Sequence, residues 1–135
     1  MSFKEISQIA GSAMAAQTVR LNTVASNLAN ADSVAGNEAG TYRARKPVFA
    51  AVMNDDNTGG RVQVLDVVES NDPVRKVFEP GNPLANADGI VFYSNVNQVA
   101  EMTDMMAASR AFETNVEVLG RIRGMQQSLL KLGEG

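Results

Sequence analysis

The chain of 135 residues contains no cysteine, no histidine and no tryptophan, and aromatic residues make up only 5% of it. Without cysteine and histidine there is no disulfide, no thiolate nucleophile, no imidazole base and none of the usual zinc ligand sets. The formal net charge is only −3, which gives no electrostatic reason to bind nucleic acid or an anionic membrane. We therefore expect a chain that is not an enzyme and that uses no cofactor and no metal.

Long apolar runs are also missing. No uninterrupted apolar stretch approaches the roughly 20 residues that span a bilayer. Near the N-terminus Lys4 is followed at once by Glu5, and the longest apolar run there is confined to residues 13–16. This pattern does not predict a cleaved secretory signal. The hydrophobic content of 44% is instead that of one globular domain.

The longest patterned stretch runs from residue 96 to residue 132 and contains no proline. Its apolar residues recur at steps of three or four, which predicts one stripe along an α-helix. Asn95 followed by Gln98 resembles a capping box, and Gly133 stands where a C-cap is expected. A helix of this length measures about 55 Å, which is more than so small a chain can cover, although an ordinary core helix is the alternative. The predicted stripe comprises Val99, Met102, Met106, Phe112, Val116, Leu119, Ile122, Met125 and Leu129.

A second helix is predicted from Ser2 to about Ala31. Ser2 and Glu5 have the spacing of a capping box, and a heptad of mainly apolar residues follows over four repeats. A seam of this length is typical of a helix that pairs with another helix. Its positions are Phe3, Ala10, Gln17 and Val24 on one side and Ser7, Met14, Leu21 and Leu28 on the other.

Residues 32–95 change to turn and strand patterns, with two strands predicted at 48–53 and 61–69 around a polar loop, and shorter candidates at 74–79 and 90–93. The expected fold is mainly α with a small β insert. Residues 1–31 and 96–135 form a discontinuous helical core, in which two long terminal α-helices pack antiparallel as a coiled-coil-like pair. Residues 32–95 form a loop and β-rich insert that contains a β-hairpin, and we expect this insert to cover only one end of the helix pair.

The polar clusters do not amount to a catalytic site. The acidic loop that begins at Asp55 lacks the ligand spacing of a calcium-binding EF-hand. The basic residues between Arg43 and Lys46 are best explained by salt bridges at a strand edge or between subunits. Glu113 and Glu117 are bracketed by arginines on one helix face, which is typical of a solvated helix surface.

Two such helices carry more apolar surface than a small single chain tolerates in the open. We therefore expect neighbouring subunits to complete the seam of the first helix and the methionine-rich region of the second. If one patch meets a different patch on the next copy, the contact builds a ring or a helical tube. A finite coiled-coil adaptor or export-chaperone-like dimer remains the alternative.

Several segments resemble signatures of the bacterial flagellar axial protein family. Residues 21–32 (LNTVASNLANAD) resemble the signature near the start of these proteins, and residues 101–116 (EMTDMMAASRAFETNV) resemble their C-terminal signature. Residues 42–49, 81–89 and 93–97 narrow the resemblance to the proximal-rod proteins of the flagellar basal body.

The resemblance implies a structural subunit of the proximal rod. Such a subunit is exported without a cleaved signal peptide through the flagellar type III apparatus, polymerises through its terminal helices into a tube that crosses the periplasm, and transmits torque. The implied partners are copies of itself, the other proximal-rod proteins, the hook–basal-body junction protein at the rod base and the distal side of the rod, with no nucleic acid and no small-molecule substrate. The helices would line the inner tube and the insert would face outward.

The resemblance also implies which residues lie in packing contacts. Asn27 and Asn30 are placed to cap the first helix, and Asn115 is placed to form a hydrogen bond across an interface. Together with the apolar seam and stripe, these motif positions give the predicted assembly interface: Phe3, Met14, Leu21, Asn22, Val24, Asn27, Leu28, Asn30, Met102, Met106, Arg110, Phe112, Glu113, Asn115, Val116 and Leu119.

Overall fold

The computed structural model describes residues 2–56 and 59–134, and these fold into two long helices and five strands. The predicted fold class is confirmed, because the helices lie at the two ends of the sequence and a small antiparallel β region lies between them. Met1, Gly135 and two residues of the predicted hairpin loop, Asn57 and Thr58, lie outside the described residues. The elements are α1 (Phe3–Ala29), β1 (Val34–Ala35), β2 (Arg45–Met53), β3 (Gly60–Glu69), β4 (Arg75–Phe78), β5 (Ile90–Tyr93) and α2 (Gln98–Glu134).

Helix α1 has the predicted start and a side-chain cap at its end. The Ser2 hydroxyl accepts a hydrogen bond from the Glu5 amide at 3.2 Å, and the Glu5 carboxylate accepts one from the Ser2 amide at 2.6 Å. Asn30 caps the other end, as predicted, and its amide group donates to the Ser26 carbonyl at 2.9 Å. These bonds satisfy backbone groups that a helix end leaves without partners.

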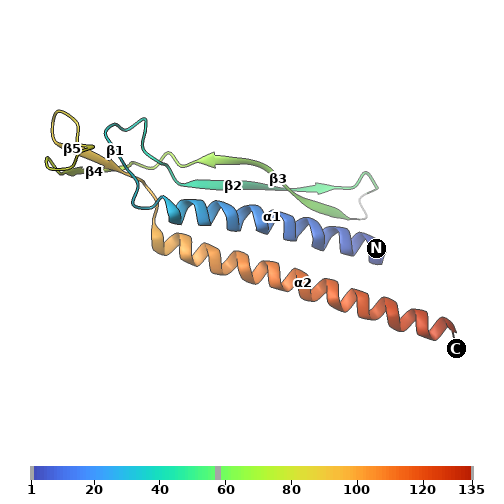
Figure 1. Cartoon of the computed structure of the whole chain (residues 1–135). Coiled ribbons are helices and arrows are strands. Elements are labelled where there is room, and N and C mark those ends of the chain that lie inside the picture. The colour runs from blue at the N-terminus through green and yellow to red at the C-terminus, as the bar shows by residue number, and fades with distance from the viewer. Residues whose placement is uncertain (1, 57–58, 135) are drawn as a thin grey trace.

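Helix α2 runs antiparallel to α1 and lies beside it over most of its length (Figure 1). Asn97 caps its start and accepts a hydrogen bond from the Ala100 amide at 3.1 Å. The predicted capping box at Asn95 is wrong, because the Asn95 side chain is committed elsewhere and accepts a hydrogen bond from the Ala44 amide at 2.7 Å. The helix continues through Gly133 to Glu134, so the predicted C-cap at Gly133 is also wrong.

Strands β2 and β3 form a long antiparallel hairpin on the side of α1 that faces away from α2 (Figure 1). The register shifts after Val48, where Leu65 is the extra residue of a bulge. The Ser12 hydroxyl accepts a hydrogen bond from the Val62 amide at 3.0 Å, and Asn27, four turns further along α1, bonds to the backbone of β2. The expectation that the insert covers only one end of the helices is therefore wrong, because the hairpin follows α1 lengthwise.

The other three strands form a small antiparallel sheet in the order β1–β5–β4, at the end of the molecule where α1 finishes and α2 begins (Figure 1). The candidates at 74–79 and 90–93 are confirmed as β4 and β5. Strand β1 was not predicted, because two residues in a run of turn formers carry no periodicity. It is a strand only because Val34 pairs with Tyr93.

The interior is thin and built from small side chains. Its buried apolar residues are Ala10, Ala16, Val24, Ala31, Ala44, Val74, Val91, Val96, Ala108 and Ile122. Such side chains allow the layers to approach closely but bury little area each. Within residues 2–56 and 59–134, no helix is long and apolar enough to cross a membrane, and no acidic cluster is suited to hold a metal ion.

Candidate assembly surface

Helix α1 is covered on two sides by its own chain. By helical spacing, Ala16 and Thr23 share a side of α1 with Ser12 and Asn27, which bond to the hairpin, whereas the buried Ala10 and Val24 lie at heptad positions of the predicted seam. The first helix therefore has little apolar surface left to offer to another subunit.

The face of α2 that meets α1 follows a strict heptad. Glu101, Ala108 and Ile122 are buried, and Asn115 between them is half-buried. A spacing of seven keeps one side of a helix against its partner over many turns. Eight of the predicted interface residues occupy this α1–α2 seam and are at least partly buried within one chain: Phe3, Met14, Leu21, Val24, Leu28, Phe112, Asn115 and Leu119.

An ion pair fixes the two helices against each other. The guanidinium of Arg20 donates to a single carboxylate oxygen of Asp104, through Nε at 2.8 Å and also through Nη2. Sequence reasoning missed this pair, since nothing local connects two residues 84 positions apart. It contributes alignment more than stability, because partly exposed pairs are worth little.

The opposite side of α2 is not covered by any of the described residues. Val99, Met102 and Met106 are 74%, 55% and 62% exposed, and Arg110 and Glu113 continue the same side at helical spacing. We call these five residues the outer face of α2. The predicted stripe therefore divides in two: Phe112, Leu119 and Ile122 turn toward α1, and its other members are exposed. Of the remaining predicted interface residues, Asn22 and Val116 are also exposed.

The C-terminal part of α2 extends past the start of α1 (Figure 1). The helix has 37 residues against 27 in α1, and residues 123–134 are all exposed. Leu129 and Leu130 border a shallow hollow together with Phe3. A helix end of this kind has no tertiary packing of its own, which is where most helical stability comes from.

Asn27 joins α1 to the hairpin and does not cap the helix, so that prediction is wrong. Its side chain is 0% exposed, donates to the Arg45 carbonyl at 2.8 Å and accepts from the Arg45 amide at 2.9 Å. The Tyr42 hydroxyl also donates to it at 2.8 Å. Asn115 bonds within its own helix, where it donates to the Ala111 carbonyl at 2.7 Å.

Two family models match the chain. The model described as "Flagella basal body rod protein" matches residues 8–36, and the model described as "Flagellar basal body rod FlgEFG protein C-terminal" matches residues 87–132. The flagellar basal-body rod protein FlgC of Salmonella typhimurium strain LT2 is 48% identical over 134 residues, which covers 99% of this chain and 100% of that protein. The proteins of the same name from Yersinia enterocolitica and Bacillus subtilis are 44% and 32% identical, and the second match covers 93% of this chain and 95% of that protein.

The chain belongs to the FlgC family of flagellar basal-body rod proteins. The resemblance drawn from the sequence is thereby confirmed. A FlgC-family chain is a structural subunit of the basal-body rod and not an enzyme. The two family models fall on α1 and α2 with the turns beside them, and they leave the β2–β3 hairpin outside.

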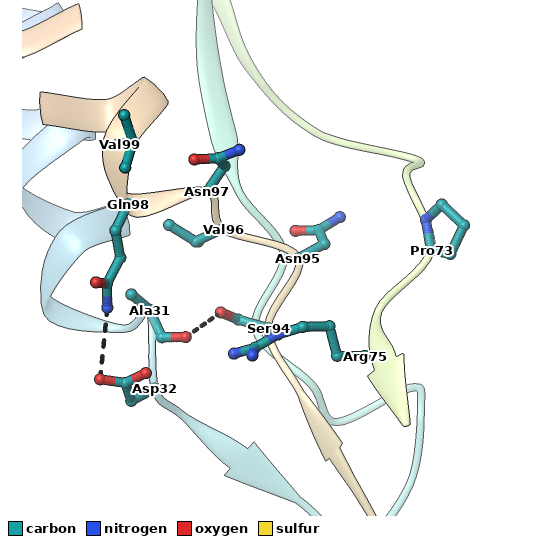
Figure 2. Close-up of a pocket in the computed structure, with 10 residues that line it drawn as sticks. All are labelled: Ala31, Asp32, Pro73, Arg75, Ser94, Asn95, Val96, Asn97, Gln98 and Val99. Atoms are coloured by element: carbon teal, nitrogen blue, oxygen red, sulfur yellow. Dashed lines mark hydrogen bonds between the residues drawn. The ribbon is translucent and has the colours of Figure 1, made fainter. Parts of the chain in front are cut away.

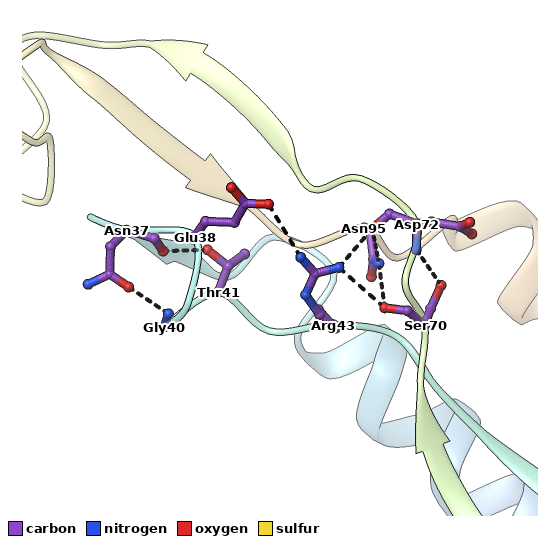
Figure 3. A network of polar contacts seen from close by, with 8 residues as sticks. All are labelled: Asn37, Glu38, Gly40, Thr41, Arg43, Ser70, Asp72 and Asn95. Atoms are coloured by element: carbon purple, nitrogen blue, oxygen red, sulfur yellow. Dashed lines mark hydrogen bonds and ion pairs between the residues drawn. The ribbon is translucent and has the colours of Figure 1, made fainter.

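In this FlgC-family chain a polar network joins the loops on both sides of the hairpin to the segment before α2. The Arg43 guanidinium donates to the carbonyls of Ser70 and Asp72 and pairs with Glu38, and Asn95 donates to the same two carbonyls (Figure 3). The loop after β3 is thus tied to the segment that leads into α2. The prediction of salt bridges for the basic residues at 43–46 is confirmed here and in the Arg45–Glu69 pair at 3.9 Å, which joins β2 to β3.

A cavity of about 480 Å³ lies beside this network, where α1 ends and α2 begins (Figure 2). The buried Ser94 hydroxyl donates to the Ala31 carbonyl at 2.7 Å, and the Gln98 side chain reaches Asp32 at 3.5 Å (Figure 2). On the other side, Arg75 lies over the Tyr93 ring at 5.2 Å. These contacts are structural, since each polar group is used to hold chain segments together.

Proposed function

We propose that this chain polymerises through the outer face of α2 and the exposed C-terminal part of that helix, and that the resulting tube is the proximal part of the rod. In this arrangement residues 1–31 and 96–135 form the helical core near the tube axis, and residues 32–95 face outward. The tube crosses the periplasm and transmits torque from the base of the rod to its distal side.

The observation that carries this proposal is the unequal coverage of the two helices. Among the described residues, helix α1 lies between α2 and the hairpin, whereas α2 packs mainly on α1. Val99, Met102 and Met106 therefore stand open, and burying each would contribute about 1.5–3 kcal/mol. A surface of this kind favours contact with another protein over exposure to water.

The partners follow from the same asymmetry. Because the outer face of α2 differs from the seam and from the hairpin, a neighbour that meets it with a different patch continues the assembly instead of closing it. We propose that copies of this chain and the other proximal-rod proteins take these places, with the hook–basal-body junction protein at the base and the distal rod at the other end. Export without a cleaved signal peptide is part of the same proposal.

The test compares two methionines of similar exposure in different layers. Met106 on α2 is 62% exposed and Met53 on β2 is 57% exposed. Met106→Glu places a charge where the neighbour must dock, and desolvating an unpaired carboxylate costs several kcal/mol. We expect Met106→Glu to abolish basal-body rods in electron micrographs, with loss of motility, whereas Met53→Glu keeps both.

Both variants should keep the thermal unfolding transition of the parent chain in circular dichroism, since neither side chain is buried within it. Rods assembled normally from Met106→Glu would refute the proposed surface, and so would equal loss in the Met53→Glu control. Light scattering over a concentration series separates the remaining alternative, because a finite coiled-coil dimer saturates at twice the mass of one chain.

A further inference from the structure

One largely buried acidic residue has no polar partner for its side chain among the described residues. Glu101 in the first turn of α2 is only 7% exposed, yet its carboxylate forms no hydrogen bond or ion pair with another residue of the described parts. A buried carboxylate without a partner is unfavourable, because its charge loses water and gains nothing in return. Every fully occluded side-chain oxygen and nitrogen among the described residues does have a partner. The Glu101 oxygens must therefore keep an opening.

That opening is a groove of about 450 Å³ between α1, β2 and α2. Arg20 and Asp104 line it but neutralise each other, and Pro47 and Phe49 supply an apolar wall. Lys46 also lines the groove, but among the described residues it forms no ion pair with Glu101. The groove thus combines a free carboxylate acceptor with an aromatic ring.

The chemistry that fits such a groove is a guanidinium group. It is planar, it donates two hydrogen bonds side by side to one carboxylate, and its face packs against an aromatic ring. Arg110 on the outer face of α2 carries this group and is exposed, and its guanidinium forms no hydrogen bond or ion pair with any residue within the described parts. It lies next to Met106, which places it inside the surface that the proposed function assigns to a neighbour.

We propose that the groove receives the Arg110 guanidinium of a second copy of this chain, with Glu101 as its acceptor. The inference rests on the proposed function and specifies one contact within it. Glu101 and Arg110 cannot meet within one copy, because they lie nine positions apart on opposite sides of a straight helix, roughly 13 Å along its axis. A contact between two different sides of α2 also has the heterologous form that extends a polymer.

The first experiment expresses variants in cells that lack their own copy and counts basal-body rods by electron microscopy. Glu101→Gln and Arg110→Gln should each lower the count by at least about tenfold, since breaking either side of a desolvated charged pair weakens docking. The double variant should lose no more than either single variant. Asp88→Asn, at an exposed acid in the loop before β5, should leave the count unchanged.

The melting temperature of the isolated chain distinguishes the proposed role of Glu101 from a purely structural one, because loss of a structural contact would lower it. Glu101→Gln should leave the melting temperature unchanged or raise it, because a carboxylate without partners is replaced. A lower melting temperature, or a normal rod count, would overturn the inference. The inference would also be overturned if Lys46→Met lowered the rod count and Arg110→Gln did not, because Glu101 would then pair with Lys46 of its own chain.

Disulfide cross-linking tests the contact directly. The chain has no native cysteine, so only the introduced cysteines can react. Ala100→Cys is on the groove and Thr114→Cys is one turn from Arg110. These positions are roughly 21 Å apart within one helix, far beyond the about 7 Å that a disulfide bridges. Oxidation of assembled rods should therefore give a ladder of linked chains. The matched pair Ala100→Cys with Gln127→Cys, one turn from Arg123, should give none.

If only the Gln127→Cys pair forms a ladder, the arginine in the groove is Arg123 and not Arg110. If neither pair forms a ladder, the groove is not occupied by a second copy. Both results overturn the inference. They are distinguishable from failure of the proposed function, because that proposal depends on the Met106→Glu and Met53→Glu comparison and does not need Glu101.

Discussion

Replacing Asn27 by alanine should weaken the attachment of the hairpin to α1 more than any other single change in that interface. The side chain is completely buried and joins both backbone groups of Arg45 and the hydroxyl of Tyr42. Alanine leaves the Arg45 amide and carbonyl without that partner, while the Tyr42 hydroxyl keeps the Ser26 hydroxyl at 3.1 Å. Each buried group left unsatisfied costs about 1–3 kcal/mol. The gain in helix propensity offsets only ~0.5 kcal/mol. We expect a net loss of about 2–4 kcal/mol.

Asn22 provides the matched control, because it is the same residue type in the same helix. It is exposed, and its side chain makes no hydrogen bond to another described residue. Asn22→Ala should therefore stay within about 0.5 kcal/mol of the parent chain. Urea unfolding followed by circular dichroism measures the free energy of unfolding of both variants. In a thermal scan of a chain of this size, the melting temperature should fall by roughly 6–12 °C for Asn27→Ala alone.

A third variant separates the contribution of the Tyr42 hydroxyl from that of the two Arg45 bonds. Tyr42→Phe removes only the hydroxyl, which donates to Asn27 and also bonds to the partly exposed Ser26, so it should cost about 1 kcal/mol. If Asn27→Ala and Asn22→Ala unfold within about 0.5 kcal/mol of each other, the bonds to Arg45 do not stabilise the fold and the reasoning fails. It fails equally if Tyr42→Phe costs as much as Asn27→Ala.

Two further predictions concern the small sheet. The pKa of Glu79 is lowered from 4.5, first by the Asn82 side chain, which donates to its carboxylate at 3.0 Å, and then by the Tyr93 hydroxyl at 2.8 Å. Its contribution to stability is therefore fully present above pH 4.5 and is lost as the pH falls through the lower folded pKa, and Glu79→Gln should remove this part of the acid dependence of the unfolding midpoint. Gly89 has a φ of 73°, and a Cβ there would lie 2.9 Å from the Phe78 ring. Gly89→Ala should cost at least about 1–2 kcal/mol in urea unfolding, whereas Gly81→Ala, with open space around it, should cost almost nothing.

The helices and most strands were predictable because their signals are local. Periodicity predicted α1 and the hairpin, the turn residues on either side marked β4 and β5, and the Ser2 capping box needs only residues three positions apart. The start of α2 was not predictable in this way. Asn95 and Asn97 are equally good caps in sequence, and only the distant Ala44 amide, which occupies Asn95, decides between them.

The first half of the α2 seam was missed for a different reason. Glu101 and Ala108 are buried there but are not large apolar residues, so a search for apolar side chains selected Met102 and Met106, one and two positions away. The spacing does indicate the seam, because residues 101, 108, 115 and 122 are seven positions apart, as the seam residues of α1 are. Matching the period of both helices before weighing hydrophobicity would have placed the seam correctly.

Helix α2 has one side that packs on α1 and another that is exposed, so the predicted interface residues fall into two groups with different roles. Leu21, Leu28 and Phe112 are partly covered inside one copy, so substituting them acts first on the fold and only then on assembly. Met102 and Met106 are open in the folded chain, so substituting them acts on assembly alone. A polymer whose subunits fold first needs residues of both kinds, on different sides of the same helix. Helix α2 carries both, and we therefore place the neighbouring subunits against α2 and not against α1.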